Sequence, residues 1–176
     1  EKLESIPEIA HEVIKTQEDK VKKLAKKYKD SKCFFFLGRG ISSATALEGR
    51  LKLMEIAYVP AIAYPAGESK HGPISLIEPD FPVFFICPRN KTHKTVIGNI
   101  MEMKARGARI IAIIEEGDEE IKALADDYIE ITGGVPEVLS PLVYIIPLQL
   151  FAYYMAVERG YDPDKPRNLA KSVTVT

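Results

Sequence analysis

The chain contains no tryptophan, only two cysteines and only three histidines among its 176 residues. Cys33 and Cys87 lie far apart, so the sequence has neither a CxxC motif nor the disulfide framework of a small secreted protein. We expect both thiols to be reduced and buried, which is typical of a cytoplasmic protein. No two histidines have the spacing of metal ligands, so the sequence predicts no metal site, and we expect no cofactor.

A strong net charge and an uninterrupted apolar run of membrane-spanning length are also lacking. Lysine and arginine number 24 against 25 acidic residues, which gives a net charge of −1. We therefore predict binding neither to nucleic acid nor to membrane surfaces. The most apolar stretch, Ser140 to Val157, is interrupted by Pro141, Pro147 and Gln149 and indicates a buried helix. Residues 1–30 are charged and helical in pattern, unlike a signal peptide.

Length and composition are typical of one compact domain. Hydrophobic residues make up 46% of the chain and charged residues 28%, which indicates a globular protein rather than a disordered one. A chain of this length can bury a sizeable core. We expect a single domain over 1–176, with an N-terminal helix within 1–30 and a polar tail over 161–176.

Short apolar segments alternate with segments of helical periodicity. The predicted strands are 33–37, 61–64, 83–87, 109–114 and 128–131, and the predicted helices are 7–29, 42–58, 92–106, 118–125 and 140–160. Continuous apolar strands that alternate with helices predict a parallel sheet covered on both faces. We therefore expect an α/β fold, a three-layer α/β/α sandwich with a five-stranded parallel sheet of flavodoxin-like kind.

The turn Gly38 to Ser43 follows the first predicted strand, at the edge of a parallel sheet where ligands usually bind. Its amides, the start of the next helix and the hydroxyls of Ser42, Ser43 and Thr45 form a candidate phosphate loop. The motif lacks the GK[ST] of a P-loop, and Ser43 replaces the third glycine of GxGxxG. An ordinary glycine turn before a capped helix explains the pattern equally well.

Glu48, Lys52 and Glu55 lie four and then three residues apart, so they form one stripe of the second predicted helix. The rest of this helix is apolar around most of its circumference, which predicts that the helix is largely covered. A carboxylate and an ammonium beside buried surface are suited to proton transfer. The alternative is a pair of solvated ion pairs that contribute little to stability.

A polar, glycine-flanked loop, Ala66 to Pro73, separates two predicted strands and contains His71. Loops of this kind frequently hold functional residues. A single loop histidine is more often solvated than catalytic, so His71 is a candidate only. The other two histidines, His11 and His93, lie in or at the start of predicted helices, and we expect both at the surface.

Two long strings resemble a known family. These are LGRG…ALEGRLKLMEIAYVPAIAYPAGESKHGP over 37–73, and IPLQLFAYYMAVERG followed by the tail DPDKPRNLAKSVTV over 162–175. Together they resemble the second sugar-isomerase (SIS) domain of the glucosamine-6-phosphate synthase family, from about Phe34 to Val175. The family converts fructose-6-phosphate and glutamine-derived ammonia to glucosamine-6-phosphate. Its members are dimers with a glutaminase domain and a first SIS domain, neither of which this chain matches.

The resemblance implies roles for five residues. Glu55 corresponds to the base that moves a proton between carbons 1 and 2 of the aminated sugar, and Lys52 to a pocket residue that stabilises developing charge. His71 corresponds to the ring-opening acid/base, which reaches the neighbouring subunit's pocket. Lys171 corresponds to the residue that engages the sugar carbonyl, and Ala170 is implied as substrate-binding. In the family, the tail folds over the active site, and the phosphate ligands belong to the first SIS domain.

Three functions remain open at this level. The favoured one is the C-terminal half of the isomerase module of glucosamine-6-phosphate synthase. The second is a self-contained sugar-phosphate aldose–ketose isomerase that uses Ser42, Ser43 and Thr45 for the phosphate group. The third is a sugar-phosphate-binding module without chemistry, which would not need Glu55, His71 and Lys171 together.

Overall fold

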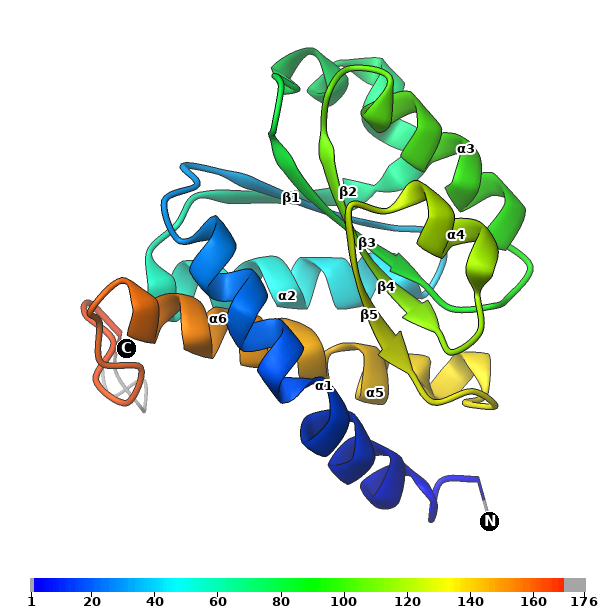
Figure 1. Cartoon of the computed structure of the whole chain (residues 1–176), viewed down its shortest axis with the longest axis horizontal. Helices are drawn as coiled ribbons and strands as arrows, with labels where there is room; N and C mark the ends of the chain where they lie inside the picture. Colours follow the sequence, from blue (N-terminus) through cyan, green and yellow to red (C-terminus); the bar gives the residue numbers. More distant parts are fainter. Residues whose placement is uncertain (1, 170–176) are drawn as a thin grey trace, which may run out of the picture.

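The computed structural model describes residues 2–169 and contains one five-stranded parallel sheet (Figure 1). The strands are β1 (Phe34–Gly38), β2 (Ala61–Pro65), β3 (Pro82–Cys87), β4 (Arg109–Glu115) and β5 (Asp127–Ile131). Their order is β2-β1-β3-β4-β5, and every neighbouring pair is parallel. The predicted parallel sheet is confirmed, and the order reverses between β1 and β3.

Helices cover both faces of the sheet (Figure 1). One layer contains α1 (Ile6–Tyr28), α2 (Ser42–Ala57), α5 (Ser140–Tyr144) and α6 (Ile146–Glu158), and the other contains α3 (His93–Lys104) and α4 (Glu119–Leu124). Three short 3₁₀ turns, η1 (Ala66–His71), η2 (Pro73–Leu76) and η3 (Glu137–Leu139), lie in the connections. The architecture is the three-layer sandwich that the alternating pattern predicts.

Each face of the sheet has its own apolar core. On the α6 side, the rings of Phe36 and Phe84 stack with their centroids 4.9 Å apart, and Phe151 of α6 meets Phe84 edge-on at 4.8 Å. On the α3 side, Phe35 and Phe85 are fully buried. Because successive strand residues point to opposite faces, the run of three phenylalanines in β1 supplies both cores.

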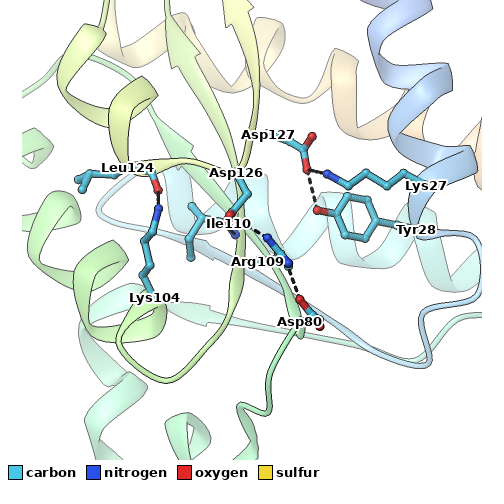
Figure 2. Close-up of polar contacts among 9 residues, drawn as sticks. All are labelled: Lys27, Tyr28, Asp80, Lys104, Arg109, Ile110, Leu124, Asp126 and Asp127. Atoms are coloured by element: carbon cyan, nitrogen blue, oxygen red, sulfur yellow. Dashed lines mark hydrogen bonds and ion pairs between the residues drawn. The ribbon is translucent and has the colours of Figure 1, made fainter.

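A polar network fixes the edge of the sheet where β4 and β5 begin (Figure 2). Asp127 accepts hydrogen bonds from Lys27 at 2.6 Å and from the Tyr28 hydroxyl at 2.7 Å. Arg109 donates to Asp80 at 2.6 Å and to Asp126 at 3.2 Å. The network therefore attaches the end of α1 and the connection before β3 to the same edge of the sheet.

The last helical segment differs from the single helix expected over 140–160. It divides at Ile145 into α5 and α6. Pro147 has no backbone N–H to donate to the carbonyl four residues earlier, and its ring disfavours straight continuation there. By length and composition, the helical stretch Glu137–Glu158 is the one described segment that could cross a membrane. One side of this stretch, with Leu148, Phe151 and Met155, packs in the core against α1 and α2. Leu142 and Val157 are about half exposed, so the expected burial holds for one side of the helix only.

Candidate functional site

Three charged residues of α2 form a chain of ion pairs. The Lys52 ammonium lies 2.8 Å from Oε2 of Glu55, one turn later, and 3.3 Å from Oε1 of Glu48, one turn earlier. The side chains of Lys52 and Glu55 are each 30% exposed. The spacing that placed these groups on one stripe is thus confirmed, and Lys52 bridges the two carboxylates.

The two carboxylates hold Lys52 in its charged form. The hydrogen bond that Lys52 donates to Glu55 is the largest influence and raises the pKa of Lys52. Partial burial of Lys52 opposes this effect, and Glu48 adds to it. A protonated ammonium beside Glu55 can attract negative charge that develops on a bound molecule. Glu55 remains the member of the pair that can accept a proton.

Glu55 lines an open cavity of about 520 Å³ between the end of α2 and residues 167–169 of the tail. The lining residues are Leu51, Met54, Glu55, Tyr58, Pro60, Arg167, Asn168 and Leu169. The cavity is mostly apolar, with the carboxylate of Glu55 as its acidic group. A mostly apolar cavity with a few placed polar groups is typical of a small-molecule site.

The tail reaches this cavity through contacts with Tyr58. The backbone N–H of Arg167 donates to the Tyr58 hydroxyl at 2.8 Å, and the Arg167 guanidinium lies 4.1 Å from the centre of the Tyr58 ring. Sequence reasoning singled out neither residue as part of a site. Tyr58 comes three residues after Glu55, so its position within one helical turn of the candidate base was a usable signal.

One expectation about α2 is wrong. The sequence predicts a largely covered helix, but Leu47, Leu51 and Met54 are between 37% and 47% exposed. The covered face of α2 contains Ala46, Gly49, Leu53 and Ala57. An apolar sequence alone does not tell which side of a helix packs within its own domain and which side faces outward.

His71 ends η1, and its side chain is 73% exposed. Its Nδ1 lies 2.8 Å from Oε2 of Glu68. This segment follows the carboxyl end of β2 and packs against α3. Pro60, which lines the Glu55 cavity, precedes the amino end of β2. His71 and Glu55 therefore do not share a cavity within the described chain.

In the candidate phosphate loop, the Ser43 hydroxyl and three backbone amides form hydrogen bonds within the turn itself. Ser42 and Thr45 are buried, and the Ser43 hydroxyl donates to the carbonyl of Gly38 at 3.0 Å. The amides of Ser42, Ser43 and Ala44 each donate at 3.1 Å to the carbonyl three residues earlier. Phosphate binding by this loop stays a prediction, and the first amides of α2 are already engaged within the turn.

His93 is not the surface residue that the sequence suggests. Its Nε2 lies 2.6 Å from Oδ2 of Asp118, and the two side chains are 16% and 1% exposed. Asp118 also caps α4 by accepting the Ile121 N–H at 3.3 Å. The pair joins the starts of α3 and α4 and lies apart from the Glu55 cavity. Over residues 2–169, no group of three or more His, Cys, Asp or Glu side chains is arranged to hold a metal ion.

Both cysteines are unpaired, and they differ in burial. Cys87 is buried at the end of β3, as expected, whereas Cys33 is partly exposed, so the expectation of two buried thiols is wrong for Cys33. Burial raises the pKa of both thiols, so neither has the lowered pKa of a reactive cysteine. The remaining site predictions, Ala170 and Lys171, lie outside the described residues.

Most of the chain matches a known domain family. The model of the SIS domain matches residues 27–159, which include the whole sheet and the Glu48–Lys52–Glu55 stripe. The chain belongs to the SIS domain family. The flavodoxin-like expectation from the alternating pattern agrees with this membership.

The chain is also similar to individual proteins and solved structures. The chain is 49% identical over 175 residues to the glutamine–fructose-6-phosphate aminotransferase of Methanothermobacter thermautotrophicus. The aligned region covers 99% of this chain but only 30% of that relative. The solved C-terminal domain of glucosamine-fructose-6-phosphate aminotransferase from Francisella tularensis superposes with a TM-score of 0.87 at 32% identity, over 93% of this chain and 46% of that one. The tagatose-6-phosphate ketose/aldose isomerase of Escherichia coli has a TM-score of 0.81 at 20% identity over 97% of this chain and 47% of its own, which shows the shared fold.

Proposed function

We propose that this chain is the C-terminal SIS half of the isomerase module of a glutamine–fructose-6-phosphate aminotransferase. It spans about 30% of the length of the curated relatives that it matches, and several of these carry that name at nearly half identity. The full-length protein would add a glutaminase and a first SIS domain. The main support for the proposal is the position of Glu55. It forms an ion pair with Lys52 and lines a cavity that tail residues 167–169 also line.

In this proposal, Glu55 is the general base of the isomerisation. It takes the proton from carbon 1 of the aminated sugar and returns a proton at carbon 2. Lys52, kept charged by its two carboxylates, stabilises the negative charge that develops between the two transfers. The cavity wall is mostly apolar, and covering this open cavity in the full-length enzyme would exclude water and strengthen both effects.

The tail supplies the second chemical group. Lys171 follows Arg167 by four residues, and Arg167 already borders the cavity. In this proposal, the Lys171 amine condenses with the open-chain carbonyl of fructose-6-phosphate to an imine and water, and ammonia then displaces the lysine. Ala170 would contact the same sugar.

His71 would act on the sugar of a neighbouring subunit. Because it does not reach its own domain's Glu55 cavity, a ring-opening role requires a second copy that brings its own η1 segment to that cavity. The exposed imidazole and its pair with Glu68 suit such a contact. A two-fold homodimer is the simplest assembly that provides it.

The self-contained isomerase is the second candidate, and the geometry of α2 disfavours it. Ser42 begins α2, and Glu55 follows 13 positions later in the same helix, so roughly 20 Å of helix separates them. This separation exceeds the length of a hexose phosphate. In this proposal, the phosphate ligands of a substrate at Glu55 lie outside the Ser42–Thr45 loop, and the first SIS domain supplies them.

A single assay separates these functions. The 176-residue chain and the full-length enzyme are each incubated with fructose-6-phosphate and either glutamine or concentrated ammonium, and glucosamine-6-phosphate and glucose-6-phosphate are measured. We expect glucosamine-6-phosphate from the full-length enzyme only. Sugar isomerisation by the chain alone at an ordinary enzymatic rate would instead support the self-contained isomerase.

A further inference from the structure

A second cavity, of about 390 Å³, lies at the carboxyl ends of the strands, between η1 and α3. The lining residues are Arg39, Gly67, Glu68, Lys70, Lys94, Thr95, Gly98, Asn99 and Glu102, and none of them lines the Glu55 cavity. The strand order reverses between β1 and β3, and the helices that follow these strands, α2 and α3, lie on opposite faces of the sheet (Figure 1). Since Arg39 directly follows β1, the cavity lies beside the place where ligands of parallel sheets usually bind. We call it the switch-point cavity.

Neutral groups hold the Arg39 guanidinium in place. Its Nη1 donates a hydrogen bond to Oδ1 of Asn99 at 3.0 Å, and Asn99 itself is buried. A Cβ at Gly67 would lie 2.8 Å from the same Nη1, so a larger residue there would displace the guanidinium. The planar end of Arg39 is thus oriented in the cavity without a carboxylate that neutralises its charge.

Two cations of the switch-point cavity have no acidic partner. Lys70 lies 2.7 Å from Oε1 of Glu102, and its hydrogen bond is the largest of the influences that lower the pKa of Glu102. This pair therefore neutralises itself. Within residues 2–169, neither Arg39 nor Lys94 forms an ion pair. Two uncompensated positive charges at one cavity favour an anionic ligand.

We propose that the switch-point cavity binds the phosphate group of a small molecule through Arg39 and Lys94. A guanidinium can donate two parallel hydrogen bonds to phosphate oxygens, and an ammonium adds a second positive charge against the phosphate dianion. The cavity is larger than a phosphate group, and Glu68 and Thr95 in its lining can form hydrogen bonds with hydroxyl groups. The recognised chemistry is therefore phosphate, either free or as an ester of a hydroxylated molecule.

This site is separate from the phosphate site that a substrate at Glu55 needs. Arg39 comes three residues before Ser42, where α2 begins, and roughly 20 Å of helix separates Ser42 from Glu55. A ligand at Arg39 would thus bind in addition to a substrate at Glu55. The inference does not depend on the proposed function.

Calorimetric titration of the 176-residue chain tests the site, with inorganic phosphate, fructose-6-phosphate and uncharged fructose as probes. We expect at least one phosphate probe to bind and fructose not to bind. Arg39→Met should weaken binding by about 10- to 100-fold, the usual effect of losing a hydrogen bond between charged groups. Arg39→Lys should recover only part of the affinity, because it keeps the charge and loses the planar fork. Arg106→Met is the matched control, since Arg106 follows α3 and does not line the cavity.

Hydrogen exchange locates the bound phosphate. Because Glu68 and Lys70 belong to η1, saturating inorganic phosphate should slow amide exchange over residues 66–71 several-fold. Exchange over residues 54–58, at the Glu55 cavity, should not change. Arg39→Met should abolish the slowing, while its circular dichroism and Tm stay close to those of Arg106→Met. The same ligand would restrict the segment that ends at His71.

The outcomes separate the sources of the phosphate and the two proposals. Equal affinity for inorganic phosphate and fructose-6-phosphate would show that the free ion is sufficient, and tighter binding of the ester would show that the sugar contributes; both results support the site. Failure of both probes to bind, binding of fructose as tight as that of its phosphate, or equal weakening by Arg39→Met and Arg106→Met would overturn it. None of these results depends on glucosamine-6-phosphate formation, so the phosphate site and the proposed function can fail independently.

Discussion

Pro60 and His71 lie beyond opposite ends of β2. Pro60 precedes the strand and lines the Glu55 cavity, whereas His71 ends the 3₁₀ turn that follows the strand. A five-residue strand spans roughly 16 Å. The candidate base and the candidate ring-opening group of one chain are therefore held apart by the fold itself.

This separation predicts that mixed subunits restore activity. Full-length His71→Ala and Glu55→Gln subunits are each expected to be inactive, but a heterodimer combines one intact Glu55 with one intact His71. Random mixing should recover about a quarter of the wild-type sites, because half of the dimers are mixed and each has one intact site. If mixed dimers are demonstrated and no activity returns, His71 does not act across the dimer.

Lys52 should matter for catalysis more than for stability. We expect Lys52→Met to lower kcat of the full-length enzyme by about 10²- to 10³-fold, the usual effect of losing one group that stabilises developing charge. Lys122→Met is the matched control, since Lys122 also bridges two carboxylates, Glu119 at 3.3 Å and Glu130 at 3.4 Å. Equal effects of the two substitutions on kcat would contradict the role of Lys52.

The packing of α2 against α6 requires a glycine. A Cβ at Gly49 would lie 2.4 Å from Cδ1 of Leu148 and 3.2 Å from its Cβ. We expect Gly49→Val to reduce the free energy of unfolding by about 1–3 kcal/mol through overpacking. Gly98→Val, in α3, is the control, because nothing lies within 4 Å of a Cβ there. Urea denaturation that gives equal losses for both variants would contradict this account of the α2–α6 contact.

Stability should fall at alkaline pH. Tyr154 donates its hydroxyl to Glu18 at 2.6 Å, which raises the pKa of Tyr154 to about 12. Burial, first among the causes, raises the pKa of Tyr28 and Tyr144 well above the ordinary value. The folded chain therefore keeps phenol protons that the unfolded chain loses near pH 10. The stability that these protonated tyrosines contribute is complete below about pH 10 and is lost as the pH rises through the pKa values that the tyrosines have in the folded chain.

Tyrosinate absorbance at increasing pH checks this prediction. The absorbance should rise in two stages, and the second stage should coincide with loss of far-ultraviolet circular dichroism. A single transition of all tyrosines near pH 10 with the fold intact would show that the folded state does not retain these protons.

The sheet could be predicted because its strands are short, apolar and separated by helical periodicity. Phe34, Phe35 and Phe36 can all be buried only if both faces of the strand are covered, which already indicates three layers. The division of the last helix at Ile145 depends on the local effect of Pro147. The sequence shows the proline, but it does not show whether the helix breaks there or continues with a kink, because both occur at prolines.

The candidate site was only partly predictable. Helical spacing brings Lys52 to Glu55, since both lie on one element. The contact of Tyr58 with Arg167 joins positions 109 residues apart, and the burial of His93 depends on Asp118, 25 residues further along the chain. Contacts between residues so far apart in the sequence depend on how helices and strands pack, and the spacing of residues within one segment does not predict that packing.

The central claim is that Glu55 is the base of a sugar isomerisation, and kcat of the full-length Glu55→Gln enzyme tests it most directly. Glutamine keeps the size and the hydrogen bonding of the side chain, so the KM for fructose-6-phosphate should stay within a few-fold of the wild-type value. Loss of a general base should lower kcat by about 10²- to 10⁴-fold. A Glu55→Gln enzyme that retains more than half of the wild-type kcat would contradict the account.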